Sequence, residues 1–238
     1  MSVDKRSTYA TCDDIEVICL KFGIEQQEAV CVNSYIKGVD AVRQDAITRN
    51  DFAPSDSYYP GIRSKVADTY TVELVRNFSQ IFEGFFGLKL KDIKRIVSRY
   101  SIVTFQPEEL GLLQRIPHFD ALSRNSIAIV HYLCDKPDSG TTLYRHRKTG
   151  FEYVDNLRIP AYMKSVEESF NKLSDQPSEY ICGSTEEYEE IDSFEAVYNR
   201  VVMYRGTSLH SGIIGPDYSF DPNPKTGRLT AITFIQFD

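Results

Sequence analysis

Strand-like runs dominate the chain after Ile93, and they constrain the fold more than any other feature. The runs are apolar or alternate between apolar and polar residues, and turn residues separate them: 96–97, 100–105, 126–133, 140–145, 198–205 and 228–237. Alternation with a period of two places every second side chain on the same face, which favours strands over helices. One helix is expected among them, over 160–173, because Pro160 suits a first helical position. The sequence therefore predicts a mainly β second half.

The first ninety residues predict a strand over 15–20 and then helices over 33–47 and 66–86, joined by a loop over 50–63. Long helices that precede a β core typically cover the outside of one sheet, and we expect the same here. The acidic run 186–190 predicts a solvated loop. We expect a single domain, in which 1–92 forms an N-terminal strand with supporting helices and 93–238 forms the β core.

Composition indicates an ordinary globular protein and excludes several classes. The chain has 238 residues, 42% of them hydrophobic, and a formal net charge of −7. An acidic chain without a clustered basic excess is not typical of a nucleic-acid-binding domain, so no nucleic acid partner is expected. The five cysteines are scattered and contain no Cys-x-x-Cys pair, which fits reduced thiols. With no signal-like or membrane-spanning run, a cytoplasmic protein without a membrane partner is expected.

A His-x-Asp triplet, His118-Phe119-Asp120, carries the strongest chemical signal. Residues two apart share a face of an extended segment, and Pro117 favours the extended setting, so both side chains can bind one metal ion. Chance alone gives about 0.6 such triplets in a chain with four histidines and 34 acidic residues. The order of the residues that follow adds weight. His210 comes just after an apolar run, and Arg228 opens another run further on.

Two imidazoles and one carboxylate on one face of an octahedron leave three positions open, which is the arrangement of non-haem Fe(II) oxygenases. In this order of motifs the chain resembles the Fe(II)/2-oxoglutarate-dependent oxygenases over roughly 95–238. The resemblance implies a double-stranded β-helix (jelly-roll, cupin-like) core. It also implies Fe(II) bound by His118, Asp120 and His210, and the 2-oxoglutarate C5-carboxylate bound by Arg228, whose planar guanidinium suits a carboxylate.

The stretches 59–63, 114–120 and 139–146 are similar to an uncharacterised bacterial branch, so the resemblance brings no substrate with it. It implies a dioxygen-dependent hydroxylation of a small molecule or of an amino-acid or peptide side chain. Halogenation is not expected, because related halogenases lack the carboxylate ligand that Asp120 supplies. Tyr132 and Tyr100 are candidate donors to 2-oxoglutarate, with simple core packing as the alternative. The oligomeric state stays open, with a homodimer among the alternatives.

Two other functions compete with an oxygenase. A zinc hydrolase would use the same three ligands around a catalytic water, but no His-Glu-x-x-His helix is present. A non-catalytic barrel that binds metal or a small carboxylate would keep the same residues without turnover.

Other polar residues near the motif have a simpler reading. His131 is expected to be a hydrogen-bonded imidazole within a strand, and His146 a member of an exposed basic cluster. The arginines at 115, 124, 145 and 147 are close to the motif in sequence. Either they bind an anionic group of the substrate, or they serve surface solubility.

Overall fold

Two antiparallel sheets form the body of the protein in a computed structural model that describes residues 8–54 and 58–238. The large sheet contains, in spatial order, β1 (Glu16–Phe22), β2 (Gln27–Asn33), β9 (Val201–Arg205), β6 (Ser126–Tyr132), β11 (Thr230–Phe237), β5 (Ile93–Val103), β4 (Gly61–Lys65) and β3 (Ala53–Pro54). The small sheet contains β10 (His210–Ile214), β7 (Lys136–His146) and β8 (Tyr188–Ala196). The expectation of a mainly β protein is confirmed.

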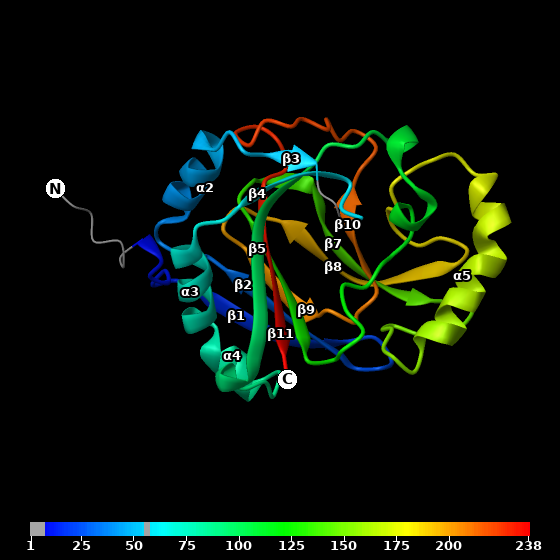
Figure 1. Cartoon of the computed structure of the whole chain (residues 1–238), viewed down its shortest axis with the longest axis horizontal. Helices are drawn as coiled ribbons and strands as arrows, with labels where there is room; N and C mark the ends of the chain where they lie inside the picture. The colour runs from blue at the N-terminus through cyan, green and yellow to red at the C-terminus, as the bar shows by residue number, and fades with distance from the viewer. Residues whose placement is uncertain (1–7, 55–57) are drawn as a thin grey trace.

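Helices are few, and most precede the β-rich half of the chain. They are α2 (Val39–Thr48), α3 (Asp68–Asn77), α4 (Ser79–Gly84) and α5 (Ile159–Ser174), with short 3-10 turns η1 (Leu90–Asp92), η2 (Pro107–Glu109) and η3 (Leu112–Gln114). In Figure 1, α2, α3 and α4 lie along one side of the large sheet, whereas α5 lies on the opposite side of the molecule. No helix in the described part of the chain is long and apolar enough to cross a membrane.

Three clusters of buried side chains connect these layers. The first joins residues of α2, α3 and α4, such as Leu74 and Phe82, to one face of the large sheet. The second fills the space between the two sheets and includes Tyr132 and Tyr204 from the large sheet and Leu143 from the small one. The third packs α5 against the other face of the small sheet. The large sheet is therefore covered by helices on one face and by the small sheet on the other.

In strand β6, side chains on both faces of the large sheet are buried. Ile127 and Ile129 point into the helix-side cluster, and the alternate residues point into the space between the sheets. Because both faces are buried, the residues between Ser126 and His131 are all apolar. His131 lies on the helix side, where Nδ1 and the Tyr70 hydroxyl are 2.9 Å apart and Nε2 lies 3.2 Å from Asn199 Oδ1. The expected hydrogen-bonded, structural role of this histidine is confirmed.

Several predicted elements are wrong in extent. The helix expected over 33–47 begins only at Val39, because Ile36 forms an isolated β-bridge with Thr11. The helix over 66–86 is divided at Phe78 into α3 and α4. Strand β2 was missed, although it lies between β1 and β9, and the loop over 50–63 contains part of β4. The acidic run belongs in part to β8, where Tyr188 is buried.

Gly61 lets β4 approach β5 closely, and β4 carries a residue of the site described below. A Cβ at this position would lie 2.1 Å from the carbonyl oxygen of Ile102, a backbone atom that cannot rotate away. The preceding carbonyl of Pro60 accepts hydrogen bonds from Thr104 and Phe105 N–H at 3.1 and 3.3 Å. A side chain at position 61 would therefore push the two strands apart.

We expect Gly61→Ala to lower the free energy of unfolding by about 1–3 kcal/mol, the usual effect of forcing a methyl group into a packed site. Urea unfolding followed by circular dichroism measures the change. Gly84→Ala is the matched control, because no atom lies within 4 Å of its added Cβ and alanine is favoured in helices. Equal stability of the two variants would contradict the close approach of β4 and β5.

Candidate metal centre

Backbone hydrogen bonds bring His118 next to His210, although 91 residues separate them in sequence. The His118 N–H donates to the His210 carbonyl and the His210 N–H donates to the His118 carbonyl, both at 2.8 Å. Asp120 is held in the same way, because its N–H donates to the Gly206 carbonyl at 2.7 Å. His118 thus forms an isolated β-bridge with the first residue of β10, and Asp120 lies beside Gly206, just after β9. The extended setting expected after Pro117 is found at His118, whereas Asp120 lies in a bend.

The side chains of the three residues converge on one point. His118, Asp120 and His210 each offer a ligand atom, and these atoms all lie within 4.8 Å of one another. Asp120 Oδ2 lies 3.4 Å from His210 Nε2, and Asp120 Oδ1 lies 3.8 Å from His118 Nε2. Two nitrogens and one carboxylate oxygen at these separations can bind the same metal ion.

His210 is oriented as metal-binding histidines usually are. Its Nδ1 lies 2.9 Å from the Ser208 carbonyl oxygen, which can only accept, so Nδ1 carries the proton and Nε2 keeps its lone pair. The side chain is only 6% exposed, whereas that of Asp120 is 16% and that of His118 is 54% exposed. The centre is therefore closed on the His210 side and open to solvent on the His118 side.

The electrostatic environment suits a cation. Burial lowers the pKa of His210 to about 4, so this imidazole is neutral near pH 7 and available as a ligand. Burial raises the pKa of Asp120, although the neighbouring His118 and Arg63 oppose that shift. A bound divalent cation would favour the ionised carboxylate. The donor set of two imidazoles and one carboxylate, with one open side, fits Fe(II).

Arg228 is a buried cation close to this centre. The residue is 4% exposed, and its Nη2 and Nε donate to the Gly140 carbonyl and the Ser139 hydroxyl of β7 at 2.6 and 3.2 Å. Within 8–54 and 58–238, no carboxylate forms an ion pair with it. A guanidinium has five N–H donors, and two are accounted for by these bonds. The structure thus buries a positive charge, and none of the residues it describes supplies a negative partner.

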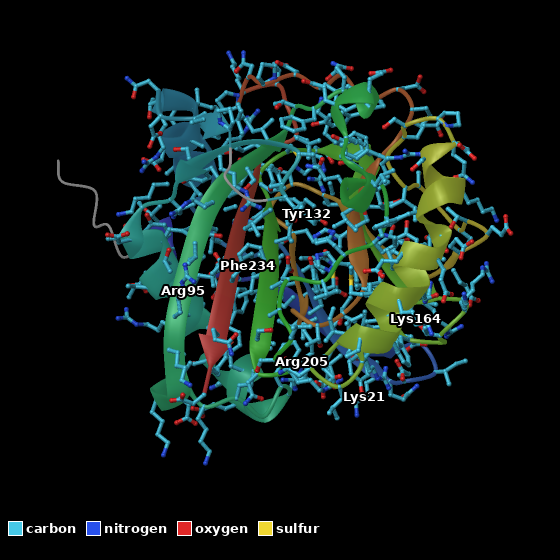
Figure 2. The ribbon with its side chains drawn as sticks, turned by 45° about the vertical axis from the view of Figure 1, so that its right-hand side comes forward. Lys21, Arg95, Tyr132, Lys164, Arg205 and Phe234 are labelled. Atoms are coloured by element: carbon cyan, nitrogen blue, oxygen red, sulfur yellow. The ribbon has the colours of Figure 1, made fainter. Side chains whose placement is uncertain are left out.

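The two predicted tyrosines lie on opposite faces of the large sheet. Tyr132 lies between the sheets, near the centre of the view in Figure 2, and the Arg228 guanidinium carbon is 5.7 Å from its ring centroid. Its hydroxyl lies 2.7 Å from that of Thr141. Tyr100 faces the helices, and its hydroxyl donates to the Val42 carbonyl and to Asp45. Tyr100 cannot reach Arg228, so its predicted role is corrected to packing against α2.

Tyr204 and Arg63 are residues near the centre to which the sequence analysis gave no role. The Tyr204 ring centroid lies 4.7 Å from that of His210, and the pKa of Tyr204 is raised by burial and by Asp120. Arg63, on β4, interacts electrostatically with Asp120. The stretch 59–63 was noticed only for its resemblance, because a lone arginine on β4, between β5 and β3, has no recognisable spacing to the triad.

The remaining polar candidates do not join the site. His146 is buried rather than exposed, with its Nδ1 2.8 Å from the Thr149 hydroxyl and its ring against Tyr162 and Tyr188. The four arginines have separate partners: Arg115 donates to the Gln176 and Pro177 carbonyls, Arg124 lies over the Tyr153 ring, Arg145 pairs with Glu152 and Glu189, and Arg147 donates to the Thr185 carbonyl. They do not form a common anion site.

The chain belongs to a protein family described as a family of unknown function, DUF6445, whose model matches residues 13–235. No curated protein sequence matches the chain significantly. Among solved structures, the non-heme alpha-ketoglutarate-dependent epimerase SnoN from nogalamycin biosynthesis is similar at a TM-score of 0.50 and 10% identity, over 90% of this chain and 79% of SnoN. At that identity the likeness shows the fold alone.

Two further structures are similar at lower TM-scores. A Pseudomonas putida prolyl-4-hydroxylase gives a TM-score of 0.48 and 12% identity, over 90% of this chain and 95% of its own. An N-substituted L-amino acid dioxygenase from Burkholderia ambifaria, in complex with alpha-ketoglutarate, gives a TM-score of 0.42 and 9% identity, over 92% of this chain and 93% of its own.

We expect the wild-type protein to bind one Fe(II) or Co(II) per chain under anaerobic conditions and His210→Ala to lose stoichiometric binding, because the buried Nε2 ligand is removed. Isothermal titration calorimetry with each metal measures this. His146→Ala is the control, since it removes a buried imidazole outside the triad. Undiminished metal affinity of the His210 variant would refute the assignment.

Proposed function

We propose that the protein is an Fe(II)- and 2-oxoglutarate-dependent dioxygenase that hydroxylates a small molecule or an amino-acid or peptide side chain. In this proposal residues 1–238 form a single domain with a double-stranded β-helix core. His118, Asp120 and His210 bind the iron, and Arg228 binds the far carboxylate of 2-oxoglutarate. Tyr132 lines the cosubstrate site beside Arg228, and Tyr100 is not part of it.

One observation carries the proposal: the triad and the buried Arg228 guanidinium lie side by side between the same two sheets. Gly212 follows His210 by two residues on β10, so the two share a face, about 7 Å apart. Arg228 Nη2 lies 3.9 Å from the position that a Cβ on Gly212 would occupy. The ring of Tyr204 lies against His210, and its hydroxyl interacts electrostatically with both Asp120 and Arg228.

This spacing suits a short dicarboxylate with one end at the metal and the other at the arginine. A glycine at 212 supports the same reading, because a larger side chain would fill the space beside Arg228. Arg228 is fixed by the Gly140 carbonyl and Ser139, so its remaining N–H groups are oriented before a ligand arrives. A charge-assisted contact with a carboxylate would then satisfy the buried cation.

Bound iron would supply the activation of dioxygen, coupled to the oxidative decarboxylation of 2-oxoglutarate to succinate. The residues of the chain have simpler tasks: the triad holds the metal on one face, and Ser208 keeps the His210 ring in the tautomer that can bind it. Asp120 occupies the position that the halogenases leave open for chloride, which supports hydroxylation. The fold does not decide this outcome, since SnoN is described as an epimerase.

The decisive experiment adds Fe(II) and then 2-oxoglutarate to the protein without oxygen. A weak visible charge-transfer band is expected when the keto acid chelates the iron. A zinc hydrolase would give no such band. A non-catalytic metal-binding barrel that also binds the keto acid would give the band without producing succinate when oxygen is admitted. Absence of the band at saturating concentrations would refute the proposed function.

We expect Arg228→Met to keep its iron and to bind 2-oxoglutarate roughly 10- to 150-fold more weakly, since a hydrogen bond to a charged group contributes about 1.5–3 kcal/mol. Titration of the charge-transfer band measures the affinity. Arg95→Met is the control, because Arg95 is exposed on β5 (Figure 2). If both variants bind 2-oxoglutarate as the wild type does, another basic residue binds the cosubstrate.

We expect Asp120→Ala to lose the slow substrate-independent conversion of 2-oxoglutarate to succinate, even with added chloride. The reason is that the triad loses its only negatively charged ligand. Succinate release, followed by mass spectrometry with iron occupancy measured in parallel, checks this. Full iron occupancy with unaltered turnover in the variant would show that the His-x-Asp triplet is accidental.

A further inference from the structure

A second arginine, Arg63 of β4, lies near the candidate metal centre, where it interacts electrostatically with Asp120 and His118. The antiparallel pairing places Arg63 of β4 opposite Ser101 of β5, Ser101 opposite Thr230 of β11, and Thr230 opposite Tyr132 of β6. Directly opposed residues in antiparallel strands share a face of the sheet. Because Tyr132 faces the small sheet, Arg63 lies on this same inner face.

The row between Arg63 and Tyr132 contains only small hydroxyl side chains. Ser101 and Thr230 are both fully buried, and their short side chains do not extend far from the sheet. The two ends of the row are therefore an arginine near Asp120 and a tyrosine beside Arg228. Arg63 of β4 and Arg228, two residues before β11, thus both lie near the candidate metal centre.

Arg63 is held in place, but the described part of the chain gives it no anionic partner. Its guanidinium carbon lies 4.1 Å from the ring centroid of Tyr59, so the cation is stacked on an aromatic face. Its Nε is buried and makes no hydrogen bond to any residue that the structure describes. Among those residues no carboxylate lies within ion-pair distance of it. A buried N–H donor without an acceptor costs free energy, which a bound anion would recover.

Arg99 strengthens the positive character of this face. It lies opposite Lys65 on β5, on the same side of the sheet as Arg63, and it is exposed. Lys65 is neutralised by Asp68, but no ion pair of Arg99 is found in the described ranges. In a protein with a net charge of −7, this face thus carries two arginines that form no ion pair within 8–54 and 58–238, and one of them, Arg63, interacts with His118 on the open side of the centre. Such a field attracts anions.

The cosubstrate already has a cationic site at Arg228, and Asp120 is committed to the metal. We propose that Arg63 binds a carboxylate of the primary substrate, so that the protein oxidises organic acids. This inference rests on the proposed function, because it assumes that iron and 2-oxoglutarate occupy the neighbouring positions. The stacked Tyr59 ring supplies an apolar surface next to the bound carboxylate, which suits an acid with an apolar or aromatic body.

The test compares carboxylic acids with their primary amides, which have nearly the same shape but no charge. Hippurate, 3-phenylpropionate and hexanoate, each with its amide, are titrated calorimetrically into anaerobic wild-type protein loaded with Fe(II) and 2-oxoglutarate. We expect at least one acid to bind at least tenfold more tightly than its amide. In Arg63→Met this preference should disappear, while the affinity for 2-oxoglutarate stays within twofold of the wild type.

Two further variants, Arg63→Lys and Arg95→Met, are titrated in the same way. The lysine variant keeps the charge and should retain part of the preference for acids, whereas the Arg95 variant should behave as the wild type. Circular dichroism and Fe(II) stoichiometry establish that each variant is folded and loaded.

The outcomes separate the two proposals. If the wild type does not bind 2-oxoglutarate, the proposed function fails, and this inference fails with it. If 2-oxoglutarate binds normally but no acid binds more tightly than its amide, only the role of Arg63 is overturned. If Arg63→Met weakens 2-oxoglutarate binding as much as Arg228→Met does, Arg63 serves the cosubstrate instead.

Discussion

The two backbone hydrogen bonds between His118 and His210 are the contact on which the candidate site depends. They fix an irregular segment against the first residue of β10, and the Asp120–Gly206 bond fixes the same segment against the end of β9. Both ends of the triplet are therefore positioned by main-chain atoms rather than by flexible side chains. Such positioning keeps the ligand atoms close together before any metal binds, which reduces the ordering cost of binding.

Burial makes the charged groups near the triad costly unless they have a partner. Arg228 lies in the space between the sheets with a carbonyl and a hydroxyl as partners, and Arg63 stacks on Tyr59 with its Nε unsatisfied. An exposed arginine without an ion pair is ordinary. A buried guanidinium such as that of Arg228, or a buried donor atom such as Arg63 Nε, carries a desolvation cost that a ligand can offset. The same region holds a single carboxylate of the triad, whose pKa burial raises. In the proposals made above, the two arginines near this carboxylate bind small anions.

The strand pairing decides which polar residues belong to this receptor. Tyr132 and Tyr100 are both tyrosines on neighbouring stretches of β-sequence, yet one faces the small sheet and the other faces α2. A strand alternates its side chains, so a shift of one residue in register reverses every assignment. The pairing of β4 with β5 brings Arg63 to the inner face in the same way. No local sequence signal contains that information.

The sequence by itself determined a mainly β protein, the strand runs of its second half, and the triplet whose atoms do lie together with His210. These features are local: alternation, a preceding proline and residue types follow from the chain within a few positions. Only the tertiary structure decided that His146 is buried and that the four arginines have separate partners. It also decided that Tyr100 lies away from the candidate site, whereas Arg63 and Tyr204 lie near it. Those outcomes depend on pairing and layering between residues far apart in sequence, whose energies no short segment contains.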